Sequence, residues 1–345
     1  MTPRTASAAR ITALTAIIVV ALLAGVGFGG VHVPAAETIA AILAKLGFAD
    51  ADPDPRMANI VMELRLPRVI LAMAAGAGLS VCGLATQAIL RNPLGDPYLL
   101  GLSSGASAGA AAVLVSGIGV SLVGALGVTG GAFVGAMAAM GMVIVLSGRG
   151  NAIEPGRIIF AGMAANYFFS AITSISIVTA KNPAATKSVT FWLLGSLNET
   201  SWRVIGLVGL SVIVGLTLLW ILGRHIDALQ LGDDPARSLG TDPVIYRVLI
   251  LTIVALLVGI IVSFTGAIGF LGLVIPHLAK KLTGGIFRHA MLTTALIGAA
   301  VLMVADLLSR VIIAPSEISV GILTALLGTP ILMFILSRQN RESSE

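Results

Sequence analysis

Residues 244–264 read VIYRVLILTIVALLVGIIVSF, and Arg247 is the only charged side chain among them. A helix that crosses the hydrocarbon core of a bilayer needs about 20 mostly apolar residues. The stretch therefore predicts a membrane-spanning helix. On both sides of this stretch, the sequence contains similar apolar runs that end at charged or turn residues. Together they bring the expected number of spans to about ten. These further runs are 11–30, 67–90, 98–117, 120–147, 157–180, 202–223, 267–282, 290–310 and 317–337.

The composition of the whole chain points to a membrane protein. Hydrophobic residues make up 57% of the 345 positions and charged residues only 11%, whereas about 25% of a soluble domain is charged. So few charges could not cover a surface in water, which excludes a soluble enzyme, a disordered chain and a nucleic-acid-binding domain. Because the connections between the runs are short, we expect an all-α polytopic membrane protein with a single transmembrane domain over residues 1–345.

The positions of lysine and arginine predict the orientation. Positive residues gather on the cytoplasmic side of membrane proteins. With the N-terminus inside and the spans alternating, most of the 21 Lys and Arg residues fall on the inner side, and the acids Asp50, Asp52, Asp54 and Glu63 fall outside. This distribution predicts that both termini are cytoplasmic. It also accounts for the formal charge of +5 without a nucleic-acid partner.

Glycine is frequent, with 40 residues in the chain, and some of these recur every four positions. Small residues at that spacing let two helices approach closely in lipid, where no hydrophobic effect drives their association. We therefore interpret such glycines as helix-packing sites. They are Gly101, Gly105, Gly109, Gly131 and Gly135.

The chain lacks the motifs of an ATPase or a zinc hydrolase. Neither the phosphate-binding loop GxxxxGK[ST] nor HExxH occurs. The four histidines are far apart in sequence, so we expect no metal site. Asp306 lies one turn before Arg310 and is interpreted as half of a structural ion pair. A proton-driven carrier would need more acids inside its spans, so any transport should draw its energy from another polypeptide.

A polar segment at about 225–243 joins two of the predicted spans. In it, Asp234 can cap a short helix, Pro235 suits the first turn and Gly240 suits a left-handed stop. An exposed, partly apolar helix of this kind suggests a partner protein on the cytoplasmic face, although an ordinary amphipathic loop has the same pattern. The residues of this predicted coupling loop are Leu231, Gly232, Asp233, Asp234, Pro235, Ala236, Arg237, Leu239 and Gly240.

Two features are expected on the external side. Arg65 and Arg68 flank Pro67, and proline is tolerated at a helix start, so both arginines should lie at the membrane interface. They are either anchors that snorkel to the interface or a basic docking point for an acidic partner. Residues 186–197 are too short to cross a bilayer, and we expect them to form a short external helix.

The chain resembles the FecCD-type, BtuC-like permeases, which are membrane subunits of type II ABC importers for iron chelates, haem and cobalamin. The resemblance covers nearly the whole chain, and its motifs occur in the expected order. They are LRLPR (64–68), RNPLGDP (91–97), LGLSSGA (100–106), FWLLGSL (191–197), LGDDPARSLG (231–240), GAIGFLGLVIPH (266–277), ADLLSR (305–310) and GILTALLGTP (321–330).

The resemblance implies a type II ABC importer permease fold in the bacterial cytoplasmic membrane. Two permease copies, or one copy and a sister permease, are expected to surround one central pathway. Two cytoplasmic ATPase subunits would bind ATP and Mg²⁺, and an extracytoplasmic binding protein would deliver the cargo. The chain itself would then be no enzyme and would bind no cofactor.

The resemblance also implies roles for individual residues. Arg65, Arg68 and Arg310 match arginines that dock the binding protein, and the 231–240 loop matches the helix that couples to the ATPase. Asn92 and Leu94 match an inner gate. Pro155 and Gly156 occupy a second gate position where the family often has small polar residues. Asn166 is polar and predicted to lie mid-membrane, so it is our candidate for the pathway, with helix packing as the alternative.

The cargo is the least determined feature. An iron chelate, either a ferric siderophore or haem, is the expectation from the family, and cobalamin is the alternative. A proton-coupled secondary transporter is the alternative from a different class. Uptake that survives collapse of the proton gradient but stops on ATP depletion would separate these classes.

Overall fold

The computed structural model describes residues 3–31, 33–45, 47, 53–117, 125–148 and 153–342. In these ranges the regular elements are all helices, which confirms the all-α prediction. The helices are α1 (Pro3–Gly27), α2 (Ala35–Lys45), α3 (Pro55–Asn59), η1 (Ile60–Arg65), α4 (Leu66–Ile89), η2 (Pro97–Leu100), α5 (Leu102–Ser116), α7 (Ala125–Ser147), α8 (Pro155–Thr179), α9 (Pro183–Leu193), α10 (Trp202–Ile221), α11 (Gly223–Leu231), α12 (Asp233–Ser238), α13 (Pro243–Thr265), α14 (Leu271–Thr283), α15 (Phe287–Val311) and α16 (Val320–Glu342).

Each predicted apolar run contains a helix, but the helices differ in length. Among the described residues, 7 helices are long and apolar enough to cross a membrane: α1, α4 with its N-terminal extension from Pro55, α7, α8, α10, α13 and α15. The apolar helices Leu102–Ser116 and Val320–Phe334 are shorter, and α14 has 13 residues. The count of ten crossings therefore stays a prediction.

A residue in the left-handed region interrupts two of the predicted spans near their start. The run 98–117 is divided at Gly101, whose φ of 78° places it in the left-handed region between η2 and α5. The run 267–282 becomes helical only at Leu271, after Phe270 with a φ of 70°. A left-handed residue cannot continue a right-handed helix, so each span loses its first turns.

Close helix crossings depend on the glycines that the spacing singled out. A Cβ added to Gly105 would collide with the carbonyl of Gly135, and one added to Gly109 would collide with that of Gly131, so α5 and α7 pack backbone to backbone. This confirms four of the five predicted packing glycines. Gly101 differs, because its role is the left-handed turn before α5.

The helix α4 lies at the centre of the bundle. It packs against α10, α13, α14 and α15, and 78% of the apolar window in its stretch is buried. Where α4 crosses α15, a Cβ on Gly76 would collide with the carbonyl of Gly298. The residues on both ends of α4 are therefore held in place by several neighbouring helices.

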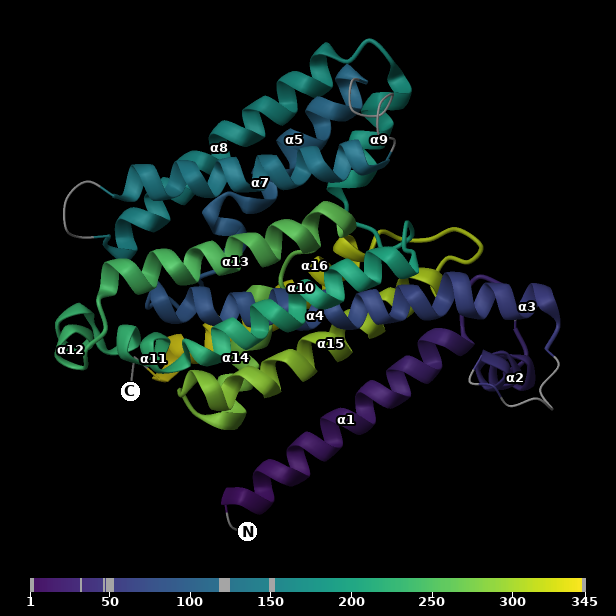
Figure 1. Cartoon of the computed structure of the whole chain (residues 1–345), viewed down its shortest axis with the longest axis horizontal. Coiled ribbons are helices and arrows are strands. Elements are labelled where there is room, and N and C mark those ends of the chain that lie inside the picture. The colour runs from purple at the N-terminus through teal and green to yellow at the C-terminus, as the bar shows by residue number, and fades with distance from the viewer. Residues whose placement is uncertain are drawn as a thin grey trace.

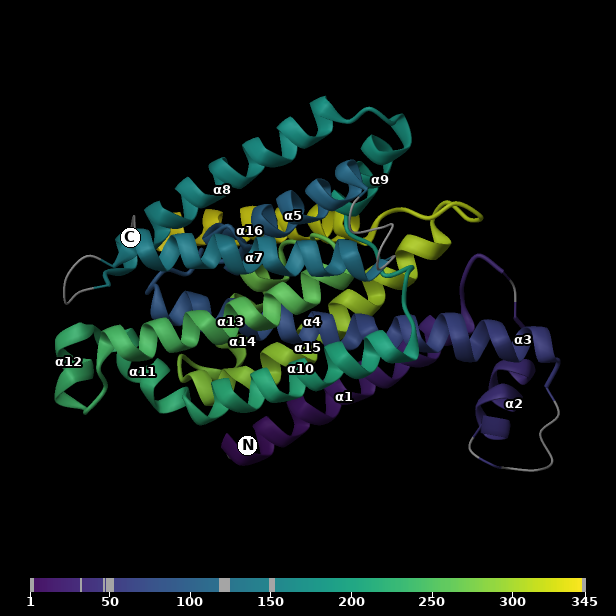
Figure 2. The same ribbon diagram turned by 45° about the horizontal axis from the view of Figure 1, so that its top comes forward.

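The bundle has two distinct ends, which we call the α12 end and the α2 end after the helices found there (Figure 1). The helices α11 and α12 lie at one end, and α2 and α3 lie at the other. The turned view shows that α1 begins and α16 ends on the side of the α12 end (Figure 2). The start of α1 and the end of α16 therefore lie on the same side of the bundle as the predicted coupling loop.

The predicted short helix at 186–197 is present with shifted bounds. The helix α9 begins at Pro183 because the Asn182 side chain accepts a hydrogen bond from the Ala184 amide and caps it. It ends at Leu193, shortly before Gly195 with a φ of 72°. It lies at the α2 end (Figure 1).

Candidate functional site

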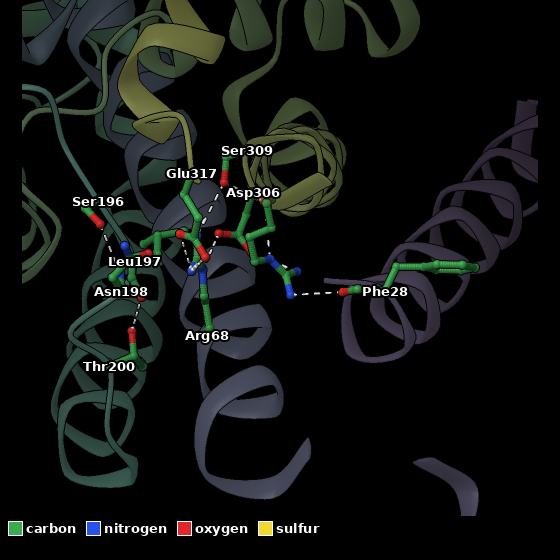
Figure 3. A network of polar contacts seen from close by, with 10 residues as sticks. Phe28, Arg68, Ser196, Leu197, Asn198, Thr200, Asp306, Ser309 and Glu317 are labelled. Atoms are coloured by element: carbon green, nitrogen blue, oxygen red, sulfur yellow. Dashed lines mark hydrogen bonds and ion pairs between the residues drawn. The ribbon is translucent and has the colours of Figure 1, made fainter. Parts of the chain in front are cut away.

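A buried ion cluster at the α2 end surrounds Arg68, near the start of α4. The Nε atom of Arg68 lies 2.6 Å from Oδ1 of Asp306 on α15, and its Nη1 lies 2.9 Å from Oε2 of Glu317 in the loop before α16. Nη2 also donates to the Ser309 hydroxyl at 3.3 Å. Figure 3 shows the guanidinium between the two carboxylates. The cluster thus joins α4, α15 and the last loop.

Two further arginines extend this cluster to α1. Nη2 of Arg310 lies 3.0 Å from Oδ2 of Asp306, which confirms the predicted i, i+4 pair, and Nη1 donates to the Phe28 carbonyl at 3.2 Å (Figure 3). Arg65 donates to the carbonyls of Val26 at 3.1 Å and Gly27 at 2.8 Å. The last carbonyls of a helix have no partner within it, so these arginines bind the C-terminal end of α1.

The predicted docking arginines are therefore buried groups with partners inside this chain. The exposed fractions are 5% for Arg65, 8% for Arg68 and 4% for Arg310. The docking role stays a prediction. An acidic partner protein would have to displace Glu317, whose side chain is the most exposed member of the cluster.

A second ion cluster, at the α12 end, surrounds Asp233 in the first turn of α12. Its Oδ1 lies 2.8 Å from Nη2 of Arg247 on α13 and 3.2 Å from Nη2 of Arg91, which follows α4. Its Oδ2 accepts from Nη1 of Arg247 at 3.3 Å. The same Nη1 donates to the Ile153 carbonyl, just before α8. The hydrogen bond from Arg247 is the main reason why the pKa of Asp233 lies below its usual value.

The coupling loop itself forms a short helix, α12, with one exposed leucine before it and another after it. Gly232, with a φ of 122°, precedes α12, and Gly240, with a φ of 77°, follows it, which confirms the predicted left-handed stop. Leu231 and Leu239 are 67% and 65% exposed, whereas Ala236 is buried. Figure 1 shows α12 at the far end of the bundle. The loop therefore presents two exposed leucines that flank a short, well-defined helix.

The start of this helix differs from the prediction. It begins at Asp233 with Gly232 in the capping position, and no side chain caps it. The Asp234 carboxylate instead lies 3.0 Å from Nη1 of Arg237, one turn along. The reason is that Asp233, one residue earlier, is held by the two arginines outside the loop.

The loop is also attached to α13 through aromatic and hydroxyl groups. The ring of His225 on α11 stacks on Tyr246 with centroids 3.7 Å apart. Its Nδ1 lies 2.9 Å from the Thr241 hydroxyl. These contacts attach α11, before the loop, to Thr241 and Tyr246, after it.

The residues predicted for the first gate lie in the turn after α4. The Asn92 side chain accepts a hydrogen bond from the Leu94 amide at 2.9 Å, which stabilises the turn, and Leu94 is 41% exposed. Arg91, next to Asn92, has a φ of 50° and belongs to the Asp233 cluster. The turn therefore presents Leu94 and is attached to α12.

The second predicted gate and the pathway residue lie on α8. Pro155 is the first residue of α8, and a Cβ added to Gly156 would meet nothing. Asn166 is half-buried, and its backbone packs against Gly101. Phe160 and Tyr167 on the same helix are 73% and 75% exposed. The wide exposed face of α8 fits a helix that borders lipid, a pathway or a second subunit.

Sequence reasoning missed three members of the two clusters: Arg91, Arg247 and Glu317. Arg91 and Arg247 have the appearance of ordinary positive charges near span ends, and no motif marks Glu317. None of the three has its partner within one helical turn. In the part of the chain that the structure describes, no three His, Cys, Asp or Glu side chains gather as metal ligands would.

Comparison with known proteins decides the family. The sequence profile of the FecCD transport family matches residues 17–338. The chain belongs to the FecCD transport family. FecCD proteins are permease subunits of ABC transporters, so this chain is a multi-pass transport subunit of the inner membrane, and ATP hydrolysis belongs to a partner ATPase.

Individual FecCD relatives agree with this assignment. The uncharacterized ABC transporter permease protein YvrB of Bacillus subtilis (strain 168) is 38% identical, over 94% of this chain and 92% of the relative. The hemin transport system permease protein HmuU of Yersinia pestis is 36% identical, over 84% and 86% of the two chains. A solved structure described as an inward-facing conformation of a metal-chelate type ABC transporter has a TM-score of 0.82 at 26% identity, and covers 95% of this chain and 98% of that one.

Proposed function

We propose that this FecCD permease imports an iron-containing chelate, a ferric siderophore or haem, that an extracytoplasmic binding protein delivers. The observation that carries this proposal is the resemblance over most of the chain to a hemin permease and to a metal-chelate type transporter. Two copies of the chain would form the pathway, and the exposed face of α8 is available for such an assembly. A sister permease in place of the second copy, and cobalamin as cargo, are the alternatives.

The α12 end is proposed to face the cytoplasm and to receive the ATPase. The exposed Leu231 and Leu239 supply an apolar tip that a cleft on the ATPase can bury. Since α12 is short and enclosed by Gly232 and Gly240, it can move as one piece. Closure of the ATPase dimer on ATP would push this helix and shift the equilibrium between inward-open and outward-open states.

The gates are proposed to lie close to this end. Leu94, held in its turn by Asn92, would close the pathway at the end of α4. Pro155 and Gly156 would form the second constriction at the start of α8, and Asn166 would line the pathway further in. At the α2 end, the binding protein is proposed to dock over the arginine cluster, with its own carboxylates competing with Glu317 for Arg68.

The test is transport by the purified complex of the permease, its ATPase and its binding protein in proteoliposomes. Hemin, a ferric hydroxamate and cobalamin are offered in turn. We expect ATP-dependent accumulation of one iron chelate, unaffected by collapse of the proton gradient. Accumulation that needs the gradient and no ATP would overturn the proposal in favour of a secondary transporter, and uptake of cobalamin alone would correct the cargo.

A further inference from the structure

Two arginines from different segments contact the carboxylate of Asp233, and one of them also contacts a third segment. Arg91 reaches the carboxylate from the turn after α4, and Arg247 reaches it from α13. Through Arg247, the Ile153 carbonyl before α8 is joined to the same group. The coupling helix is thus connected by polar contacts to the two segments where the gates are proposed.

The burial of Arg247 makes this connection a stiff one. Its side chain is completely buried, and a buried guanidinium needs acceptors for its donors. The acceptors that the described residues provide are Asp233 and the Ile153 carbonyl. Because one planar guanidinium holds both, a displacement of Asp233 is passed to Ile153, two residues before Pro155.

The branch to Arg91 is held by backbone geometry. Arg91 has a φ of 50°, a left-handed conformation that is unfavourable for a residue with a Cβ. The guanidinium of Arg91 lies next to Gly232, since a Cβ added to Gly232 would be 3.5 Å from Nη1 of Arg91. Gly232 itself has a φ of 122°, a conformation that requires glycine. Both conformations occur beside the ion pair of Arg91 and Asp233, and Arg91 directly precedes Asn92 of the first gate.

We infer that Asp233 is the positioning residue that links the coupling helix α12 to both gates, so that one push moves them together. The inference rests on the proposed function. A purely structural brace would hold the loop without passing on its movement. The positioning role and the purely structural role predict different results when Asp233 is replaced. Only the positioning role predicts that less cargo is moved for each ATP hydrolysed.

The first experiment tests the link without transport. Hydrogen exchange is measured on the full chain in nanodiscs for wild type, Asp233→Asn and Asp234→Asn. Asp234 is the matched control, because it is the adjacent carboxylate and its side chain is 95% exposed. For Asp233→Asn we expect exchange to rise about tenfold in both residues 92–95 and residues 153–158, since local opening determines exchange. A response in one segment only, or an equal response in Asp234→Asn, overturns the inference.

The second experiment tests transmission in the complex with its ATPase, in proteoliposomes. For Asp233→Asn we expect co-purification with the ATPase and continued ATP hydrolysis, but about tenfold less cargo per ATP, the size of a typical coupling between sites. Asp233→Glu should restore most of the ratio because it keeps the charge. Glu154→Gln, an exposed carboxylate beside Ile153, is the control and should leave the ratio unchanged.

The outcomes separate this inference from the proposed function. If wild type shows no ATP-driven uptake, the proposed function fails, while the exchange experiment still decides whether the link exists. If wild type transports and Asp233→Asn moves the same cargo per ATP, the proposed function stands and the positioning role of Asp233 is refuted.

Discussion

The two ends of the bundle contain ion clusters that share a centre of two arginines and one aspartate but lie in different surroundings. In each cluster two arginines hold one aspartate, Asp306 at the α2 end and Asp233 at the α12 end. The Asp306 side chain is completely buried, whereas that of Asp233 is 26% exposed. The first cluster joins long helices, and the second joins the short helix α12 to α13, to the turn after α4 and, through Arg247, to the residues before α8.

The difference in exposure between the two aspartates indicates different mechanical roles. We call the α2 cluster a brace, because it holds helices in fixed positions, and the α12 cluster a joint, because it can move. Removing one partner of a buried ion pair leaves a charge without water or a counter-ion, and this is strongly unfavourable. Where charges are near water, solvent replaces a lost partner, so the partly exposed pair of Asp233 and Arg91 contributes little, whereas Arg247 in the same cluster is completely buried. The α2 cluster is therefore suited to hold α1, α4 and α15 together. The α12 cluster, which is buried at Arg247 and open to water at Asp233 and Arg91, is suited to move with α12.

The largest effect should follow from Asp306→Ala. The change leaves Arg68 and Arg310 without their shared carboxylate in a buried site, so we expect a loss of roughly 3–5 kcal/mol in the free energy of unfolding. Thermal unfolding of the purified permease in detergent measures it. Wild-type stability of this variant would show that the cluster is not the brace that its burial indicates.

A smaller effect is expected from Glu317→Gln at the edge of the same cluster. Its side chain is 34% exposed and water can replace it beside Arg68, so about 1 kcal/mol or less should be lost. The same unfolding assay applies. Equal losses for Glu317→Gln and Asp306→Ala would contradict the gradient from edge to interior on which the comparison depends.

Replacing residues 234–240 with a flexible Gly-Ser linker should change stability least and function most. The exposed part of α12 contributes few buried groups, so the unfolding temperature should stay near that of wild type. ATP hydrolysis by the complex should continue while cargo uptake falls to background, because a flexible chain does not pass on displacement. Normal uptake by this variant would refute a mechanical role for α12.

The smallest effect is expected from a change of pH. The pKa of Asp233 is lowered, so its ionised form is the one that the fold stabilises. Its contribution is fully present above the ordinary aspartate pKa and is lost only as pH falls through the lowered value. Between about pH 5 and pH 8, exchange protection of residues 92–95 and 153–158, corrected for intrinsic rates, should therefore stay constant. A decline within that range would place another titrating group in control.

The sequence was sufficient for features that depend on near neighbours. The pair of Asp306 and Arg310 could be predicted because residues four apart on a helix meet whatever the rest of the chain does. The packing of Gly105 and Gly109 on α7 followed from their spacing, since small residues repeated on one helix face permit close crossing.

Features that join remote segments were not accessible in the same way. Arg68 and Glu317 are 249 positions apart, and their contact requires α4, α15 and the last loop to be packed first. Arg247 has the sequence appearance of an ordinary positive residue near a span end. Only the packed structure shows that it is completely buried between Asp233 and Ile153.

By itself the sequence determined the membrane class, the helical content and the motifs of a FecCD permease. It could do so because a bilayer selects each span by its own length and apolarity, with little reference to the other spans. Tertiary structure decided which charges are buried, which are paired and which remain near water. Those properties depend on how the helices pack, and they are what separates the brace at Asp306 from the joint at Asp233.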